Sequence, residues 1–268
     1  MPWRENAREW AERLSPAAFL YSTYETRLLA DIDPARLPIH IAVMADGNRR
    51  WARLNAPGQE LTVGYQAGAD KLKQFVEWCD EVGIRVVTLW VLSTDNLTRD
   101  AEEVGPLLDV IVRLATDLAA SGRWRVQIVG DLDMLPSDVA ASLRAAEVSS
   151  EAAPGLHVNI AVAYGGRSEL RDAVRSLLHE EAAKGRTLDE VAENLDIDNI
   201  ADHLYTAGQP DPDLVIRTSG EQRVSGFLMW QSAHSEFYFC EALWPDFRRV
   251  DFLRALRSYA DRERRYGR

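Results

Sequence analysis

Short apolar segments that alternate with amphipathic segments constrain the fold of this 268-residue chain more than any other feature. The apolar segments have the length and β-branched content of strands that are covered on both faces. Each amphipathic segment repeats its apolar residues at helical spacing, and strands that alternate with helices require right-handed crossovers, which predicts a mostly parallel sheet. Six strands are expected, at 39–45, 84–92, 125–129, 157–163, 214–216 and 237–239.

The segments between these strands predict the helices and one flexible loop. Asp100 and Glu103 form a capping-box pattern at the start of the second helix. Residues 54–64 contain Pro57, Gly58 and Gly64, which predicts a flexible loop that can close over a ligand. Helices are expected at 66–82, 102–121, 137–148, 168–179, 187–195, 200–205 and 252–264.

The length and the 46% hydrophobic content fit one large α/β domain with an ample core. Aromatic and leucine residues among charges, interrupted at Pro16, predict two short amphipathic helices near the N-terminus. We therefore expect an N-terminal helical arm over residues 1–36 and a single α/β domain over residues 37–268.

The overall charge restricts the partners of the chain. A net charge of −11 and a pI near 5.0 argue against a general nucleic-acid or anionic-membrane surface, so an anion site has to be built locally. Cys79 and Cys240 lie in apolar surroundings that suggest buried thiols. Without a signal peptide or a run of about 18 apolar residues, the sequence predicts a cytoplasmic protein that does not span a membrane, with weak peripheral association of the aromatic arm as the open alternative.

An acid followed by three arginines stands at the predicted end of the first strand. Asp46 follows the apolar run 39–45 directly, and Arg49, Arg50 and Arg53 come within eight residues of it. A carboxylate suits a divalent cation and guanidinium groups suit phosphate oxygens, which indicates a site for Mg²⁺ and a diphosphate. An Asx-type turn followed by a solvated helix start explains this stretch alone equally well.

Polar clusters follow three other predicted strand ends. They occupy 93–96, 164–167 and 217–223, and the carboxyl ends of parallel strands share one edge, where open α/β sheets bind ligands. Gly165-Gly166 and Ser219-Gly220 allow the backbone to approach a ligand closely. The chain has neither a Walker A pattern nor a G-x-G-x-x-G pattern, so the usual nucleotide folds lack support.

Four segments resemble the motifs of the cis-prenyltransferases, the undecaprenyl diphosphate synthase family. They read MADGNRRWA at 44–52, YGGR at 164–167, DLVIRTSGE at 213–221 and WPDF at 244–247, in the family's order. The resemblance implies a homodimer whose six-stranded, mostly parallel sheet and helices surround a hydrophobic tunnel. It also implies condensation of isopentenyl diphosphate with an allylic diphosphate to form a Z double bond.

The resemblance further implies roles for individual residues. Asp46, Asn96 and Ser93 would be catalytic, and Asp46 and Glu236 would contact Mg²⁺. Three residues, Val91, Leu92 and Leu107, would line the tunnel that limits chain length. Substrate-binding roles fall on Gly47, Asn48, Arg49, Arg50, Trp51, Arg99, Arg217, Arg223, Ser225, Arg265 and Gly267.

The chain departs from the family pattern at three places. The family usually has R-x-x-G-H where this chain reads LTVGY at 61–65, so Tyr65 stands in place of the histidine. Gln222 stands where many members have a histidine near the metal, and Leu97 replaces a common aromatic residue. These changes indicate a specialised member of the family.

The features of the predicted tunnel favour a short product. The helix after residue 101 is a few residues shorter than in long-chain relatives, and bulky Val91 and Leu92 stand at the strand end. We expect one addition to geranyl diphosphate, which gives the C15 product Z,E-farnesyl diphosphate. The alternatives are a medium- or long-chain polyprenyl diphosphate synthase, a noncatalytic regulatory homologue, or an unrelated phosphate-ester enzyme on a similar sheet.

Overall fold

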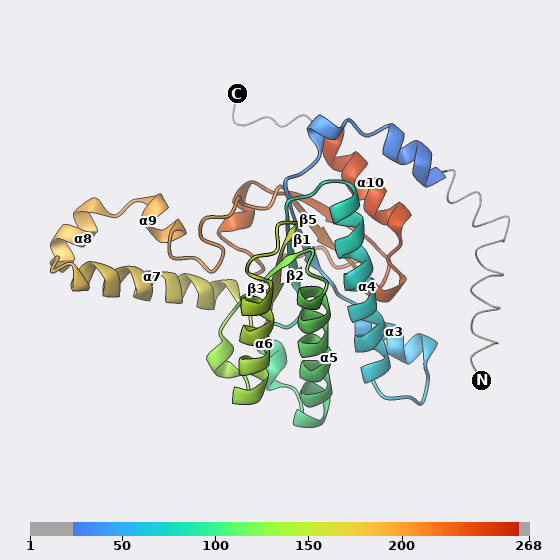
Figure 1. Ribbon diagram of the computed structural model, residues 1–268, viewed down its shortest axis with the longest axis horizontal. Coiled ribbons are helices and arrows are strands. Elements are labelled where there is room, and N and C mark those ends of the chain that lie inside the picture. Colours follow the sequence, from blue (N-terminus) through green and yellow to red (C-terminus); the bar gives the residue numbers. More distant parts are fainter. Residues whose placement is uncertain (1–23, 263–268) are drawn as a thin grey trace. The chain divides into compact units, whose positions relative to one another are not determined.

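The computed structural model describes residues 24–262, which contain a six-stranded sheet with the order β3-β4-β2-β1-β5-β6 (Figure 1). Every strand pairing among these residues is parallel, so the six predicted strands are confirmed and the sheet is all parallel rather than mostly parallel. The strands are β1 (His40–Met44), β2 (Val86–Trp90), β3 (Arg125–Val129), β4 (His157–Ala161), β5 (Leu214–Arg217) and β6 (Glu236–Phe239).

Helices follow the strands, as parallel crossovers require. Helices α4, α5 and α6 pack side by side, as the teal and green ribbons of Figure 1 show. The helices are α3 (Asn48–Asn55), α4 (Thr62–Glu81), α5 (Ala101–Ala120), α6 (Ser137–Ser150), α7 (Gly166–Ala183), α8 (Leu188–Asn194), α9 (Ile197–Ala201) and α10 (Arg249–Ala260).

The predicted flexible loop over 54–64 is shorter than expected. Helix α3 continues to Asn55 and α4 already begins at Thr62, so Gly64 is helical and buried. A Cβ on Gly68, one helical turn further, would lie 2.4 Å from Oδ1 of Asn48. Close packing of α4 on α3 therefore selects small residues, which local sequence signals interpret as a flexible stretch.

The chain divides into two compact units, and each is described by itself. One comprises residues 39–245 and holds the whole sheet, and the other combines 1–38 with 246–268. In the second unit, residues 24–30 are helical and the guanidinium of Arg254 lies 5.5 Å from the ring centre of Tyr24. The predicted break at Pro16 lies outside the described residues, and the predicted division at residue 36 stays a prediction.

A chain of buried polar side chains crosses the middle of the sheet. Nδ1 of His40 lies 2.7 Å from the carbonyl oxygen of Pro210, which can only accept, so this nitrogen donates. Nε2 of His40 then accepts from the Thr88 hydroxyl at 2.8 Å, and the same hydroxyl oxygen accepts from Nδ2 of Asn159 at 3.0 Å. The Asn159 amide exchanges further hydrogen bonds with Gln209. Burial lowers the pKa of His40 to about 4.

The two cysteines differ in burial, contrary to the expectation that both are buried. Cys79 is fully enclosed on α4, and burial raises the pKa of its thiol. Cys240, just after β6, is only partly buried because β6 is an edge strand. No helix within the described residues is long and apolar enough to cross a membrane.

Candidate active site

A cavity of about 340 Å³ opens at the carboxyl ends of β1, β2 and β5. The register pairs Met44 of β1 with both Trp90 of β2 and Arg217 of β5, so these three strands end at one level. The residues that follow the strands therefore meet, as the parallel topology predicts. The cavity is lined by Met44, Ala45, Asp46, Trp90, Val91, Leu92, Ser93, Asp95, Asn96, Arg99, Arg217, Arg223 and Ser225.

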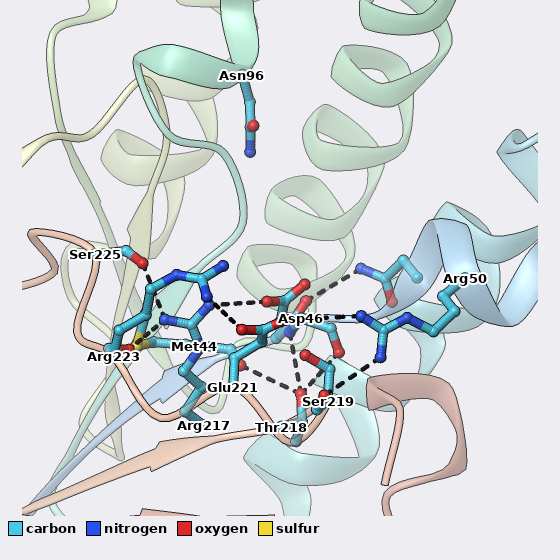
Figure 2. Close-up of polar contacts among 12 residues, drawn as sticks. Met44, Asp46, Arg50, Asn96, Arg217, Thr218, Ser219, Glu221, Arg223 and Ser225 are labelled. Carbon is cyan, nitrogen blue, oxygen red and sulfur yellow. Dashed lines mark hydrogen bonds and ion pairs between the residues drawn. The ribbon is translucent and has the colours of Figure 1, made fainter. Parts of the chain in front are cut away.

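Asp46 is held at the cavity by two residues of the segment that ends β5. Its Oδ2 accepts from the Arg217 guanidinium at 3.0 Å. The buried hydroxyl of Thr218 donates to the Asp46 carbonyl oxygen at 2.8 Å and accepts from the Asp46 amide at 3.1 Å (Figure 2). The Asp46 side chain nevertheless remains 45% exposed, so the fixed carboxylate is still accessible to a ligand.

Arg217 is a buried cation that joins Asp46 to the next loop. Its side chain is 5% exposed, and it donates to the Arg223 carbonyl oxygen and, at 3.0 Å, to the Ser225 hydroxyl (Figure 2). Arg223 itself is 64% exposed and pairs with Glu221. The loop thus presents one fixed and one accessible guanidinium, and positive charge of this kind favours an anionic ligand.

The start of α3 lies on the other side of Asp46 from Arg217 and Thr218. Gly47, its N-cap residue, has a φ of +109°, and a Cβ there would lie 2.9 Å from a side-chain atom of Leu243, so this position requires glycine. The first amide groups of α3 have no partner within the helix, and a helix N-terminus favours anions. Arg50 donates to the Ser219 carbonyl oxygen at 3.3 Å and lies 3.8 Å from Glu221 (Figure 2).

Asn96 enters the cavity from the 3₁₀ segment η2 (Asp95–Thr98), and Figure 2 shows its side chain directed toward the Asp46 group. Its Oδ1 accepts from Arg99 at 2.6 Å, and Arg99 also donates to Glu103 at 3.0 Å. Helix α5 begins after Asp100 as predicted, but the predicted capping box does not form, because the Asp100 side chain makes no capping hydrogen bond. Glu103 instead accepts hydrogen bonds from Arg49 of α3 and Tyr65 of α4.

Aromatic side chains gather beside the polar residues. Trp90 lines the cavity and stacks on Phe227 at a centroid distance of 4.9 Å, and Tyr164 meets both rings edge-on. The Tyr164 hydroxyl donates to the buried carboxylate of Glu169 at 2.5 Å. Burial raises the pKa of Glu169 and of Tyr164. An apolar wall thus stands beside the charged edge, and the Tyr164 hydroxyl in it is tied to the protein.

The structure brings most of the predicted site residues together and separates a few. The cavity contains all three predicted catalytic residues, the tunnel residues Val91 and Leu92, and the predicted binders Arg99, Arg217, Arg223 and Ser225. Leu107 is buried on α5 and Glu236 begins β6, at the strand end opposite to the Asp46 level. Arg265 and Gly267 lie outside the described residues. The remaining predicted binders lie on the α3 segment, namely Gly47, Asn48, Arg49, Arg50 and Trp51.

Sequence reasoning missed Thr218, Trp90 and the role of Glu103. Thr218 lies within the motif at 213–221 and is fully buried. Its position beside Asp46 follows from the pairing of β1 with β5, which the local sequence does not show. Trp90 ends a strand beside a predicted polar cluster, so its place at the strand end was the available signal.

The acidic residues fit one type of metal site only. Among residues 24–262, no three histidine, cysteine, aspartate or glutamate side chains form a group that could hold a metal ion. Mg²⁺ in proteins is often bound through one or two carboxylates together with phosphate oxygens and water. The exposed Asp46 carboxylate therefore fits an ion that shares its ligands with a diphosphate, and does not fit a metal cage made by the protein alone.

Comparison with known proteins places these features in a family. The family model for undecaprenyl diphosphate synthase matches residues 44–267. A (2Z,6E)-farnesyl diphosphate synthase from Thermobifida fusca is 59% identical over 92% of this chain and 97% of its own. A short-chain Z-isoprenyl diphosphate synthase from Mycobacterium leprae is 52% identical over 92% of this chain and 95% of its own.

A solved structure agrees with these matches. The crystal structure of lavandulyl diphosphate synthase from Lavandula x intermedia, in complex with dimethylallyl diphosphate, superposes with a TM-score of 0.79. It is 34% identical, and the match covers 87% of this chain and all of that chain. Family model, close relatives and fold agree, and the chain belongs to the cis-prenyltransferase family, the family of undecaprenyl diphosphate synthase.

Proposed function

We propose that this protein condenses isopentenyl diphosphate with geranyl diphosphate to form Z,E-farnesyl diphosphate, a C15 product, with release of diphosphate. One observation carries the proposal: a half-exposed carboxylate, Asp46, stands between two cationic elements at one cavity. The α3 N-terminus lies on one side, and the Arg217 and Arg223 loop on the other. Two such elements suit a reaction that holds two diphosphates at once.

The α3 side is assigned to the allylic diphosphate. Its unpaired amide groups and the half-exposed guanidinium of Arg50 can donate to phosphate oxygens, and Asp46 can share a metal ion with them. When an allylic carbon loses diphosphate, negative charge grows on the leaving group. Donors that are fixed in advance stabilise that charge without reorganising during the reaction.

The β5 side is assigned to isopentenyl diphosphate. Arg223 is accessible, and the Ser225 hydroxyl lies at the same cavity. Arg217 is largely occupied by protein acceptors, so its main contribution is to fix Asp46 and the backbone of the loop. Binding at this side would present the isopentenyl double bond to the allylic carbon.

A divalent metal, proposed to be Mg²⁺, would be held by Asp46 and by diphosphate oxygens. It supplies charge neutralisation on the departing diphosphate when bound. Glu236 was expected to be a second ligand, yet in one chain it begins β6 at the opposite strand end. Its contact with the metal therefore stays a prediction.

The bond-forming step is assigned to the part of the cavity that Ser93 and Asn96 line. After the allylic C–O bond breaks, the isopentenyl double bond attacks the allylic carbon, and the proton lost from the new chain passes to the released diphosphate or to solvent. Ser93 and Asn96 line this part of the cavity, where their polar groups can orient the reacting carbons or direct the proton. The Trp90 wall keeps water away from a carbon that carries positive charge.

Bulky residues at the end of β2, a buried leucine on α5 and the names of similar proteins all favour a short product. Val91 and Leu92 line the cavity at the end of β2, and Leu107 is buried on α5. The relatives from Thermobifida fusca and Mycobacterium leprae are described as a (2Z,6E)-farnesyl diphosphate synthase and a short-chain synthase. We keep a hydrophobic tunnel, with these three residues limiting its length, as part of the proposal.

Assembly and location complete the proposal. We propose a homodimer in which Arg265 and Gly267 reach a diphosphate of the partner subunit, as the family resemblance implies. The proposed location is the cytoplasm, with peripheral membrane association as a weaker alternative.

The proposal is tested by sizing products. The protein is incubated with Mg²⁺, labelled isopentenyl diphosphate and either geranyl or farnesyl diphosphate, and the products are separated by chain length. A single C15 product from geranyl diphosphate is expected. Products well beyond C15 would overturn the short-chain assignment, and the absence of any prenyl product from either primer would overturn the catalytic one.

A further inference from the structure

Tyr65 connects helix α4 to helix α5 through a hydrogen bond of its hydroxyl to Glu103. It lies in the first turn of α4, and the residue is 5% exposed. Its hydroxyl donates to Oε1 of Glu103, on α5, at 2.6 Å. A hydroxyl that donates to a carboxylate at this distance forms a charge-assisted hydrogen bond, which is stronger than a neutral one. The ring is stiff and enclosed, so it fixes the carboxylate from the protein side.

Glu103 joins several segments through one oxygen atom. Besides Tyr65, its Oε1 accepts from Arg99 at 3.0 Å and faces Arg49 of α3 at 3.5 Å. Although burial alone would raise the pKa of Glu103, the Tyr65 hydrogen bond and the two guanidinium groups lower it. The carboxylate is thus a permanent acceptor at neutral pH.

Arg99 connects this carboxylate to the cavity. One of its terminal nitrogens donates to Glu103, and the other donates to Oδ1 of Asn96 at 2.6 Å. Because the guanidinium is planar and rigid, a shift at its Glu103 end changes its direction at the Asn96 end. The orientation of the Asn96 carboxamide therefore depends on where Glu103 is held.

From this chain of contacts we propose that Tyr65 is a positioning residue for the reaction, acting through Glu103 and Arg99 to orient Asn96. The inference rests on the proposed function for its effect on turnover, but the orientation itself does not. Without the hydroxyl, only the two partly exposed arginines would hold the Glu103 carboxylate, and such pairs restrain side chains weakly.

The kinetic test is a double-mutant cycle of Tyr65→Phe and Asn96→Ala. The loss of one charge-assisted hydrogen bond is worth about tenfold, so Tyr65→Phe should lower kcat about tenfold and leave the KM for isopentenyl diphosphate within about twofold. In the Asn96→Ala background the same change should have no further effect, because residues that act in one chain are not additive. An equal loss in both backgrounds would overturn the proposal, as would an unchanged kcat in Tyr65→Phe.

Tyr205→Phe is the matched control. The Tyr205 hydroxyl also donates to a carboxylate, Asp172, at 2.7 Å, and neither residue lines the cavity. This variant should keep the wild-type kcat. Thermal unfolding of both variants checks that each is folded under assay conditions.

A second measurement does not depend on turnover. The side-chain amide signals of Asn96 can be assigned by NMR through their loss in Asn96→Ala. They should shift in Tyr65→Phe and stay in place in Tyr205→Phe. Unchanged signals in Tyr65→Phe would overturn the proposal even in an active enzyme, whereas shifted signals in a protein without prenyl transfer would contradict the proposed function alone.

Discussion

The middle strands of the sheet and the carboxyl edge of the sheet both hold polar side chains, but only the network across the middle strands has all its hydrogen bonds made. In the middle, His40, Thr88 and Asn159 exchange hydrogen bonds and are at most 1% exposed. At the ends, several buried polar atoms have no partner in the protein. These atoms are Trp90 Nε1, Arg217 Nε, Asn48 Oδ1 and Ser219 Oγ.

This difference separates polar groups that stabilise the fold from those that serve a ligand. Four of the seven buried polar atoms without a partner in the described residues lie at this edge. A buried polar group without a hydrogen bond costs stability, so this concentration points to a function there. Backbone geometry agrees, because Ser219 and Ser225, with φ values of 74° and 47°, both belong to the β5 side of the cavity. Substitutions at the carboxyl edge should therefore reduce activity, and substitutions in the network across the middle strands should reduce stability.

The largest effect is expected for Asp46→Ala. Loss of the carboxylate removes a preorganised charge from the leaving-group side, which should lower kcat by about 10²–10³-fold. The free energy of unfolding should fall by less than about 1 kcal/mol, because a half-exposed partner is replaced by water and Arg217 keeps two other acceptors.

Steady-state kinetics and urea unfolding of the same preparation measure both quantities. Asp133→Ala is the control, since this carboxylate is exposed on η3 (Leu132–Met134) and should leave both unchanged. A large loss of stability together with near-normal turnover in Asp46→Ala would show that Asp46 stabilises the fold and does not serve a ligand.

Acid should weaken the middle of the sheet through His40. Its pKa is near 6.5 when the chain is unfolded and about 4 when folded, so between these values only the unfolded chain takes up the proton. The free energy of unfolding should therefore fall as the pH drops from 6.5 to 4, by about 3 kcal/mol from this group. His157, with a pKa lowered by burial to about 4, contributes in the same direction.

Urea unfolding at several pH values gives the slope, and His40→Gln should reduce it by up to one proton. A slope identical to that of the wild type would show that His40 does not couple pH to folding.

Thr88→Val should give the smallest of these effects. Valine keeps the shape and strand preference of threonine but leaves Nε2 of His40 without a partner and removes one hydrogen bond of Asn159, which should cost about 2 kcal/mol of unfolding free energy. The ratio kcat/KM should remain within about twofold of wild type, because the network lies away from the cavity lining. Thr116→Val, in an exposed part of α5, is the control. A Thr88→Val variant with full stability and low activity would contradict the assignment of this network to fold stability.

Local patterns in the sequence predicted the strands and the residues that end them, because strand periodicity and turn chemistry are short-range signals. Asp46 and Arg217 could be placed at one edge from topology alone, although 171 positions separate them. Glu103 was misassigned as a capping residue because its actual partners, Tyr65 and Arg49, come from other segments. The links from Thr88 to His40 and Asn159 were likewise missed, since they depend on strand order.

The assignment of two diphosphates to two sides of one cavity is tested most directly by two variants and two Michaelis constants. Arg50→Ala should raise the KM for the allylic diphosphate about 10–100-fold, since it removes charge-assisted hydrogen bonds, and leave the KM for isopentenyl diphosphate within about twofold. Arg223→Ala should do the reverse. If both variants raised the KM of the same substrate, the two sides would not be separate binding sites and the account would be wrong.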